Sequence, residues 1–151
     1  MTLVLPNLKD KQMGQVLTTI TITNRIDQVL ADRGFISPDE IRTLTLDKVL
    51  VDTGATLLSL PANLIAQLGL TQLGETNVET ASGIRRGRIF RDVELFIEGR
   101  YATFDCLEMP EGVSAVLLGV IPMERLGLEP DLKNQRLRVL PMNEEQTYLM
   151  V

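Results

Sequence analysis

The sequence has no histidine, no tryptophan and a single cysteine, and aromatic residues make up only 4% of it. Without histidine, Ser-His and Cys-His catalytic pairs and histidine-ligated metal sites are excluded. Cys106 has no partner for an internal disulfide, and its apolar neighbours Phe104 and Leu107 indicate a buried thiol rather than a nucleophile. Catalysis by this chain would therefore depend on carboxylates.

Long apolar runs and excess positive charge are also lacking. No run approaches the roughly 18 apolar residues of a membrane helix, and residues 1–10 lack the features of a secretory signal. The net charge is -5, and Arg85, Arg86 and Arg88 form only a local basic patch, which either favours acidic substrates or is merely solvated. We expect a cytoplasmic protein with no nucleic-acid or membrane partner, and the single cysteine agrees with a reducing compartment.

The first half of the chain predicts two strands and two helices. Residues 14–23 alternate as a strand does, and residues 45–51 have the composition of a buried strand. The run Ser37-Pro38-Asp39-Glu40 is typical of a helix start. A second helix is predicted after Pro61, with Gly69 suited to its C-terminal end.

The second half predicts hairpins and short strands. A turn region is expected over residues 81–87, between strands. The strands are predicted at residues 77–80, 88–97, 101–109, 114–118 and 136–140. A weak internal repeat is also visible, because an apolar strand, a glycine turn, a proline-started helix and a terminal glycine occur at 51–69 and again at 116–127. Such units are common, so a chance likeness remains an alternative.

One motif points to chemistry. The run Leu50-Val51-Asp52-Thr53-Gly54-Ala55-Thr56 places an acidic residue between an apolar strand and a glycine turn. A string of this type is expected by accident in about one chain in a thousand of this length, judged from average residue usage. The position suits carboxylate chemistry better than solvation.

These residues resemble the retropepsin-like family of aspartic peptidases, which comprises the retroviral-type proteases and their bacterial relatives. Residues Asp52-Thr53-Gly54-Ala55-Thr56 resemble the catalytic loop, and Leu117-Leu118-Gly119 resemble the strand that passes through the ψ-shaped loop around it. The hairpin that contains Thr80, Ala81, Ser82, Gly83 and Ile84 stands where the family has the flap that closes over substrate.

The resemblance implies a mainly β fold: a retropepsin-like acid-protease closed barrel or β-meander with one or two short helices and one lobe per protomer. We expect one domain over residues 1–151, which are 44% hydrophobic. Its core would span about 14–140, with an insertion-like segment at 24–43 and a C-terminal strand or tail at 141–151.

The resemblance also implies a mechanism and a dimer. Two carboxylates that share one proton can activate water, one as base and the other as acid, a pattern known from aspartic proteases. The chain has one Asp-Thr-Gly, so a two-fold homodimer would supply the second carboxylate. By analogy Asp52 is the acid/base group, Thr53 braces the two loops, and Gly54 offers a backbone N–H to the carboxylate. Loop support is assigned to Thr56, Leu117 and Leu118, and close packing to Gly119.

Three functions are compatible with these observations. The first is a homodimeric aspartic endopeptidase acting on polypeptides, with no metal or organic cofactor. Because Ala55 cannot donate a hydrogen bond to the carboxylate, we expect it to work at a less acidic pH than pepsin-like enzymes. The second is a catalytically silent dimeric module that binds peptides or proteins. The third is a structural subunit in which Asp52 only caps a turn.

Overall fold

The computed structural model describes residues 2–5 and 15–141, and most of its elements are strands. In chain order the elements are β1 (Thr2–Val4), β2 (Val16–Asn24), α1 (Arg25–Asp32), the 3-10 helix η2 (Pro38–Glu40), β3 (Thr43–Val51), β4 (Leu58–Leu60), α2 (Ala62–Leu68), β5 (Thr71–Thr80), β6 (Gly83–Ile97), β7 (Arg100–Glu108), β8 (Leu117–Leu118), α3 (Val120–Leu126), β9 (Leu128–Asp131) and β10 (Arg136–Val139). The C-terminal strand or tail that we expected falls almost entirely on residues 142–151, outside the described part.

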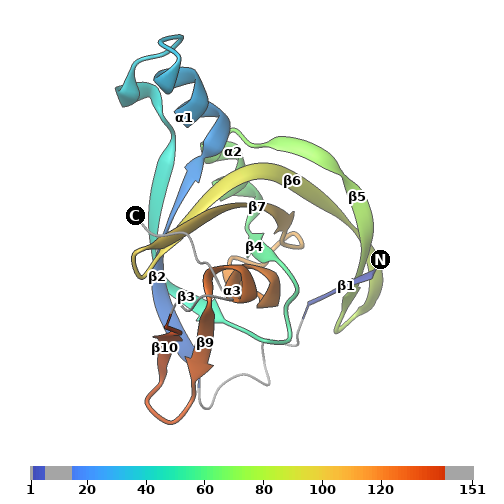
Figure 1. Cartoon of the computed structure of the whole chain (residues 1–151). Helices are drawn as coiled ribbons and strands as arrows, with labels where there is room; N and C mark the ends of the chain where they lie inside the picture. Colours follow the sequence, from blue (N-terminus) through green and yellow to red (C-terminus); the bar gives the residue numbers. More distant parts are fainter. Residues whose placement is uncertain (1, 6–14, 142–151) are drawn as a thin grey trace.

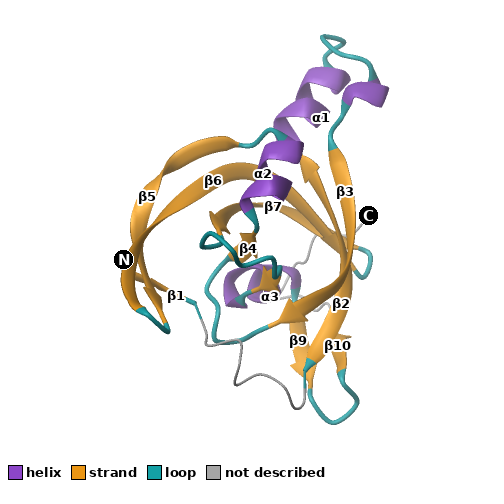
Figure 2. Ribbon diagram, turned by 180° about the vertical axis from the view of Figure 1, so that it is seen from behind, coloured by secondary structure: helices purple, strands orange, loops and turns teal. Residues whose placement is uncertain are grey.

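The main sheet closes on itself as a barrel. Its strands follow the order β6-β2-β3-β8-β4-β7, and β7 pairs with β6 to close the ring, as Figures 1 and 2 show. Strand β5 continues the sheet beyond β6, and β1 continues it beyond β5. Strands β9 and β10 form a separate two-stranded sheet. The predicted mainly β closed barrel is therefore confirmed, but the described residues form three short α-helices rather than the expected one or two.

Alternating apolar side chains fill the barrel. Val16, Ile20 and Ile22 of β2 are at most 1% exposed, and they join a core cluster to which α2 and α3 contribute Leu68 and Leu126. The β2–β3 register shifts between Thr18 and Ile20, and the β6–β7 register shifts between Phe90 and Val93. Such bulges bend strands and increase their twist, which helps a small barrel to close.

The internal repeat has a structural counterpart. Helices α2 and α3 have seven residues each, and each ends at a glycine in the left-handed conformation, Gly69 with φ 63° and Gly127 with φ 66°. A side chain is strained at such a φ, so glycine is the favoured C-terminal residue. The helix predicted after Pro61 is confirmed, with its end at the expected glycine.

The insertion-like segment holds a helix that periodicity did not predict. Asn24 caps α1 by accepting a hydrogen bond from the Asp27 N–H at 3.0 Å, and its amide donates to the Leu68 carbonyl of α2 at 2.8 Å. The buried Asp27 carboxylate pairs with Arg42, with 2.8 Å between Nε and Oδ2. Figures 1 and 2 show α1 projecting from the barrel. The predicted start at Ser37 has its capping box, but it begins only one turn of 3-10 helix.

The hairpin after α2 corrects a boundary. The predicted turn over 81–87 is wrong, because β5 runs to Thr80 and β6 begins at Gly83. The Thr80 hydroxyl donates to the Gly83 carbonyl at 2.8 Å and accepts from the Ser82 N–H at 3.2 Å, so two residues suffice for the turn. The predicted strand over 114–118 is shortened to β8.

Candidate active site

Asp52 directly follows the last residue of β3, where the sheet still holds the backbone. Val49 and Val51 of β3 are buried, and β3 runs parallel to β8 with Leu50 opposite Leu117 and Val51 opposite Leu118. The Asp52 N–H continues this ladder by donating to the Leu118 carbonyl at 3.0 Å. The carboxylate is thus attached to a backbone position fixed by two strands.

The Asp52 side chain turns back over its own loop. The residue is 3% exposed, and the Gly54 N–H donates to its Oδ1 at 2.7 Å. The Ala55 N–H donates to the Asp52 carbonyl at 3.1 Å, which closes the turn. A charge-assisted bond of this length is among the stronger ones in proteins, so the orientation of the carboxylate is well defined.

Strand β8 passes between the two strands that flank the loop. It pairs in parallel with β3 and antiparallel with β4, which begins after the loop. Immediately after β8, the Val120 and Ile121 N–H groups donate to the carbonyls of Ala55 and Thr56, each at 3.0 Å. The first turn of a helix has free N–H groups, and here α3 uses them to hold the loop. The two predicted motifs are thus brought together in space.

Gly119 makes this closeness possible. A Cβ atom built at Gly119 would lie 2.5 Å from the Leu57 carbonyl oxygen and 2.7 Å from the Ala55 carbonyl oxygen. Both atoms are backbone and cannot rotate aside, so a residue without a side chain is needed here. The sequence assigned this packing to Gly119, and the structure gives its physical cause.

The remaining loop residues differ in exposure. Thr53 and Gly54 are exposed, Thr56 is half-buried, and Ala55 is 1% exposed. Ala55 belongs to an apolar cluster with Leu117 of β8, so it packs the loop against the protein interior. Leu117 and Leu118 are fully buried. One side of the loop is therefore fixed by packing, and the other is open to contact.

The hairpin tip is exposed. Ala81, Ser82 and Gly83 are exposed, Thr80 is half-buried, and Ile84 is 67% exposed. Gly83 has φ 109°, a conformation that favours glycine at this turn. The structure thus places these five residues at the free end of a long two-stranded hairpin.

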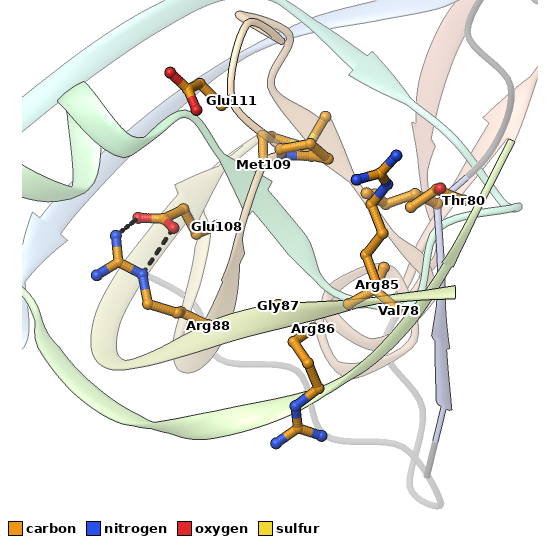
Figure 3. A pocket seen from close by; sticks show the side chains of 11 residues that line it. Val78, Thr80, Arg85, Arg86, Gly87, Arg88, Glu108, Met109 and Glu111 are labelled. Carbon is orange, nitrogen blue, oxygen red and sulfur yellow. Dashed lines mark hydrogen bonds and ion pairs between the residues drawn. The ribbon is translucent and has the colours of Figure 1, made fainter. Parts of the chain in front are cut away.

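A pocket of about 580 Å³ lies on this hairpin. Figure 3 shows Gly87 between the Arg88–Glu108 pair on one side and Arg85 on the other, with Met109 on the opposite wall. The Arg88 Nε donates to Glu108 Oε1 at 2.8 Å. Asp52 is not among its lining residues, so in one chain the pocket extends the hairpin surface rather than surrounding the carboxylate.

Cys106 is fully buried, and desolvation raises the pKa of its thiol to about 12. Within residues 2–5 and 15–141, no group of three or more His, Cys, Asp or Glu could hold a metal ion. None of the helices in these same residues is long and apolar enough to cross a membrane.

A family model described as "gag-polyprotein putative aspartyl protease" matches residues 46–125, which are 80 of the 151 residues. The match contains most of β3, the Asp52 loop, the hairpin and β8. The chain belongs to this aspartyl protease family. Family membership and the fold together indicate an aspartic protease of the retropepsin-like type, which is a class of hydrolase.

A solved structure supports the fold of this aspartyl protease. The EIAV protease complexed with the inhibitor HBY-793 is 19% identical, and the match covers 75% of this chain and 88% of that chain with a TM-score of 0.51. At this identity the likeness concerns the fold, and it supports the retropepsin-like barrel. No curated protein matches the chain.

Sequence reasoning missed β1 as part of the surroundings of the site. Leu3 and Leu5 are 2% and 8% exposed and share the cluster that contains Ala55. The apolar run Leu3-Val4-Leu5 was the available signal, but three residues are too few to tell a strand from chance.

Proposed function

We propose that this aspartyl protease is a homodimeric endopeptidase in which the Asp52 carboxylates of two protomers activate water to hydrolyse a peptide bond. The observation that carries the proposal is a buried carboxylate on a firmly held loop, with the Gly54 N–H at 2.7 Å from Oδ1. Defined orientation is what a general acid/base needs, because the reacting proton must lie within hydrogen-bond reach.

The dimer follows from the chemistry. One chain carries a single Asp-Thr-Gly, and a two-fold axis brings the same residue of each protomer to one place. The exposed side of the loop supports this arrangement, because Thr53 and Gly54 are available for contact across the axis. Each protomer would then be one lobe, formed by a single domain over residues 1–151.

The hairpin would cover a polypeptide substrate. We assign Thr80, Ala81, Ser82, Gly83 and Ile84 to this flap, which is supported by their position at the free, exposed tip between β5 and β6. Loop support is assigned to Thr53, Gly54, Ala55 and Thr56, and to Leu117, Leu118 and Gly119, which surround Asp52 through the contacts described above. The mechanism requires water and neither metal nor organic cofactor.

Substitution of Asp52 tests the chemistry. Wild type, Asp52→Asn and Asp32→Asn are incubated with a diverse peptide library from about pH 3.5 to 7, a range that begins near the ordinary pKa of an aspartate, and cuts are identified by mass spectrometry. Asp32 is exposed at the end of α1, so its variant is a matched control for the same chemical change. Cleavage by wild type and Asp32→Asn, but not by Asp52→Asn, is expected. Cleavage that survives in Asp52→Asn would reject the mechanism, and the pH series tests the expected optimum.

A mixing experiment tests the shared site. Wild type is mixed with an equal amount of Asp52→Asn and allowed to exchange subunits. If two Asp52 residues form one site, activity per wild-type protomer falls to about half, because half of the wild-type protomers then pair with a variant. Asp32→Asn is itself expected to be active, so when it is added in the same amount the activity per protomer with an intact Asp52 should stay unchanged. Undiminished activity with the Asp52 variant would show that one chain suffices.

A further inference from the structure

Strand β1 lies on the outer edge of the β5–β6 hairpin. Its three residues pair in parallel with residues 77–79 of β5, and the Leu5 N–H donates to the Glu79 carbonyl at 2.8 Å. The other edge of β5 is paired with β6. Segment 2–5 is therefore bound to the hairpin as one added strand.

The side chains of this segment alternate between burial and exposure. Leu3 is 2% exposed and Leu5 is 8% exposed, while Val4 between them is 41% exposed. Successive side chains of a strand point to opposite faces, so the two leucines enter one apolar surface together. This is the pattern of an extended peptide held in a groove by its backbone and by alternate side chains.

The surface that receives the two leucines connects the hairpin to the Asp52 loop. Its buried members are Ala55 of that loop, Val78 of β5, Leu107 of β7, Met109, and Leu117 of β8. The half-buried Val113 and Ala115, which precede β8, pack against them. Figures 1 and 2 show β1 beside β5 near the free end of the hairpin. An occupant of this groove thus lies between the flap strand and the residues that support the loop.

We propose, on the basis of the function proposed above, that this groove binds an extended peptide with apolar side chains at alternate positions, and that segment 2–5 is its intramolecular occupant. The segment competes with substrate for the free edge of β5, because one edge can pair with only one strand at a time. It acts as a built-in inhibitor, and its Leu-Val-Leu sequence indicates the substrate class: extended peptides with leucine-like residues two positions apart.

The attachment of the segment suits a reversible competitor. Strand β1 has three residues and is joined to the sheet through β5 alone in the described structure. Short, peripheral elements with few contacts open at a lower free-energy cost than the core. The pocket in Figure 3 is lined by Leu5 itself, so the groove leaves room next to the segment for a longer peptide.

Kinetics on full-length variants test the competition. The double variant Leu3→Ser/Leu5→Ser removes the two buried leucines, and Val4→Ser is the matched control on the exposed side. If the segment is bound about nine-tenths of the time, its release lowers the KM of a cleavable peptide about tenfold, since the fraction of open molecules rises by that factor. We expect an unchanged kcat, and Val4→Ser with wild-type kinetics. A double variant with the melting temperature of the wild type and an unchanged or higher KM would overturn the proposal.

A binding measurement tests the groove without cleavage. A fluorescent peptide of residues 1–7, MTLVLPN, is titrated in anisotropy experiments against Asp52→Asn proteins with and without the double substitution. We expect saturable binding, about tenfold tighter when the protein's own leucines are absent, and none with a peptide that carries serine in place of both. Lack of peptide binding by the folded double variant would overturn the proposal even if Asp52-dependent cleavage were found. Peptide binding with no cleavage by any protein would reject the peptidase and keep the groove.

Discussion

Replacing Gly119 by alanine should disturb the packing of the Asp52 loop specifically, and not that of the fold as a whole. The added Cβ would lie 2.5 Å from the Leu57 carbonyl oxygen, 2.7 Å from the Ala55 carbonyl oxygen and 2.7 Å from the Thr56 carbonyl carbon. Gly119 has φ -92° and ψ -173°, which any residue adopts easily. The cost of this variant is therefore steric and comes from the loop alone.

The expected size of the effect follows from these distances. Ordinary contact begins near 3.4 Å, so the 2.5 Å approach requires a movement of about 0.9 Å. Overpacking typically costs about 1–3 kcal/mol, and we expect the upper end because the contacts are backbone atoms. For a chain of this size, about 3 kcal/mol lowers the melting temperature by roughly 6–12 °C. A misplacement of about 1 Å can also lower catalytic efficiency about 100-fold.

Thermal melting and kcat/KM measured side by side check this reasoning, with Gly74→Ala as the matched control. A Cβ at Gly74 in β5 would meet no atom within 4 Å, and its φ is outside the left-handed region. We expect this control to stay within about 0.5 kcal/mol of the wild type, as surface substitutions usually do. A Gly119→Ala variant that melts like Gly74→Ala would refute the close packing. A lower melting temperature with full kcat/KM would refute the link from packing to the site.

Three further perturbations have expected outcomes. Hydrogen bonds from Arg42 hold the pKa of Asp27 below its ordinary 3.8, so the carboxylate stabilises the fold above about that pH, and this contribution is lost as the pH falls further. In urea titrations at several pH values, Asp27→Asn should therefore lower the unfolding free energy at pH 7 and differ less from the wild type below pH 3.8. The buried Arg100 guanidinium donates to the carbonyls of Leu126, Gly127 and Leu140, the last of which directly follows β10. Arg100→Met should therefore lower the unfolding free energy by about 2–4 kcal/mol in the same titrations, and Arg100→Lys should not restore it. Because burial raises the pKa of Cys106 to about 12, a thiol reagent at pH 7.5 should label it only in urea.

The sequence was sufficient to predict the features that depend only on neighbouring residues in the chain. An aspartate between an apolar strand and a glycine can be recognised without knowing its neighbours, and so can the glycine end of α2. Asp52 and Gly69 stand in the structure where these signals put them, one after a buried strand and the other in the left-handed conformation. The β8 strand between β3 and β4 was expected through family resemblance, because pairing between distant segments leaves little local trace.

The elements that the sequence analysis missed or misplaced have a common cause: the spacing of hydrophobic residues predicts a helix or strand only where one face of it is buried. In α1 the apolar residues Ile26, Val29 and Leu30 recur at helical spacing, but they span little more than one turn and Asp27 is the buried residue of the helix, so the pattern is too short to mark a helix. The start of β6, residues 83–86, is exposed on both faces and carries two arginines, and this pattern is typical of a turn. The pairing of β1 with β5 depends on side chains from four distant segments. The pattern of hydrophobic residues does not define elements that protrude from the barrel or pair only at the edge of a sheet.

The hydrogen bonds that hold the Asp52 loop indicate what a second protomer would add to the site. The bonds that fix the loop, from the Asp52 N–H to Leu118 and from α3 to Ala55 and Thr56, all lie within one chain. Bonds within the protomer thus already hold the loop, and a second protomer would supply the second carboxylate and a cover for Thr53 and Gly54. This is why an Asp52→Asn protomer should still fold with its loop in place. Because aspartate and asparagine have nearly the same shape, activity lost on mixing would measure the missing charge rather than a damaged interface.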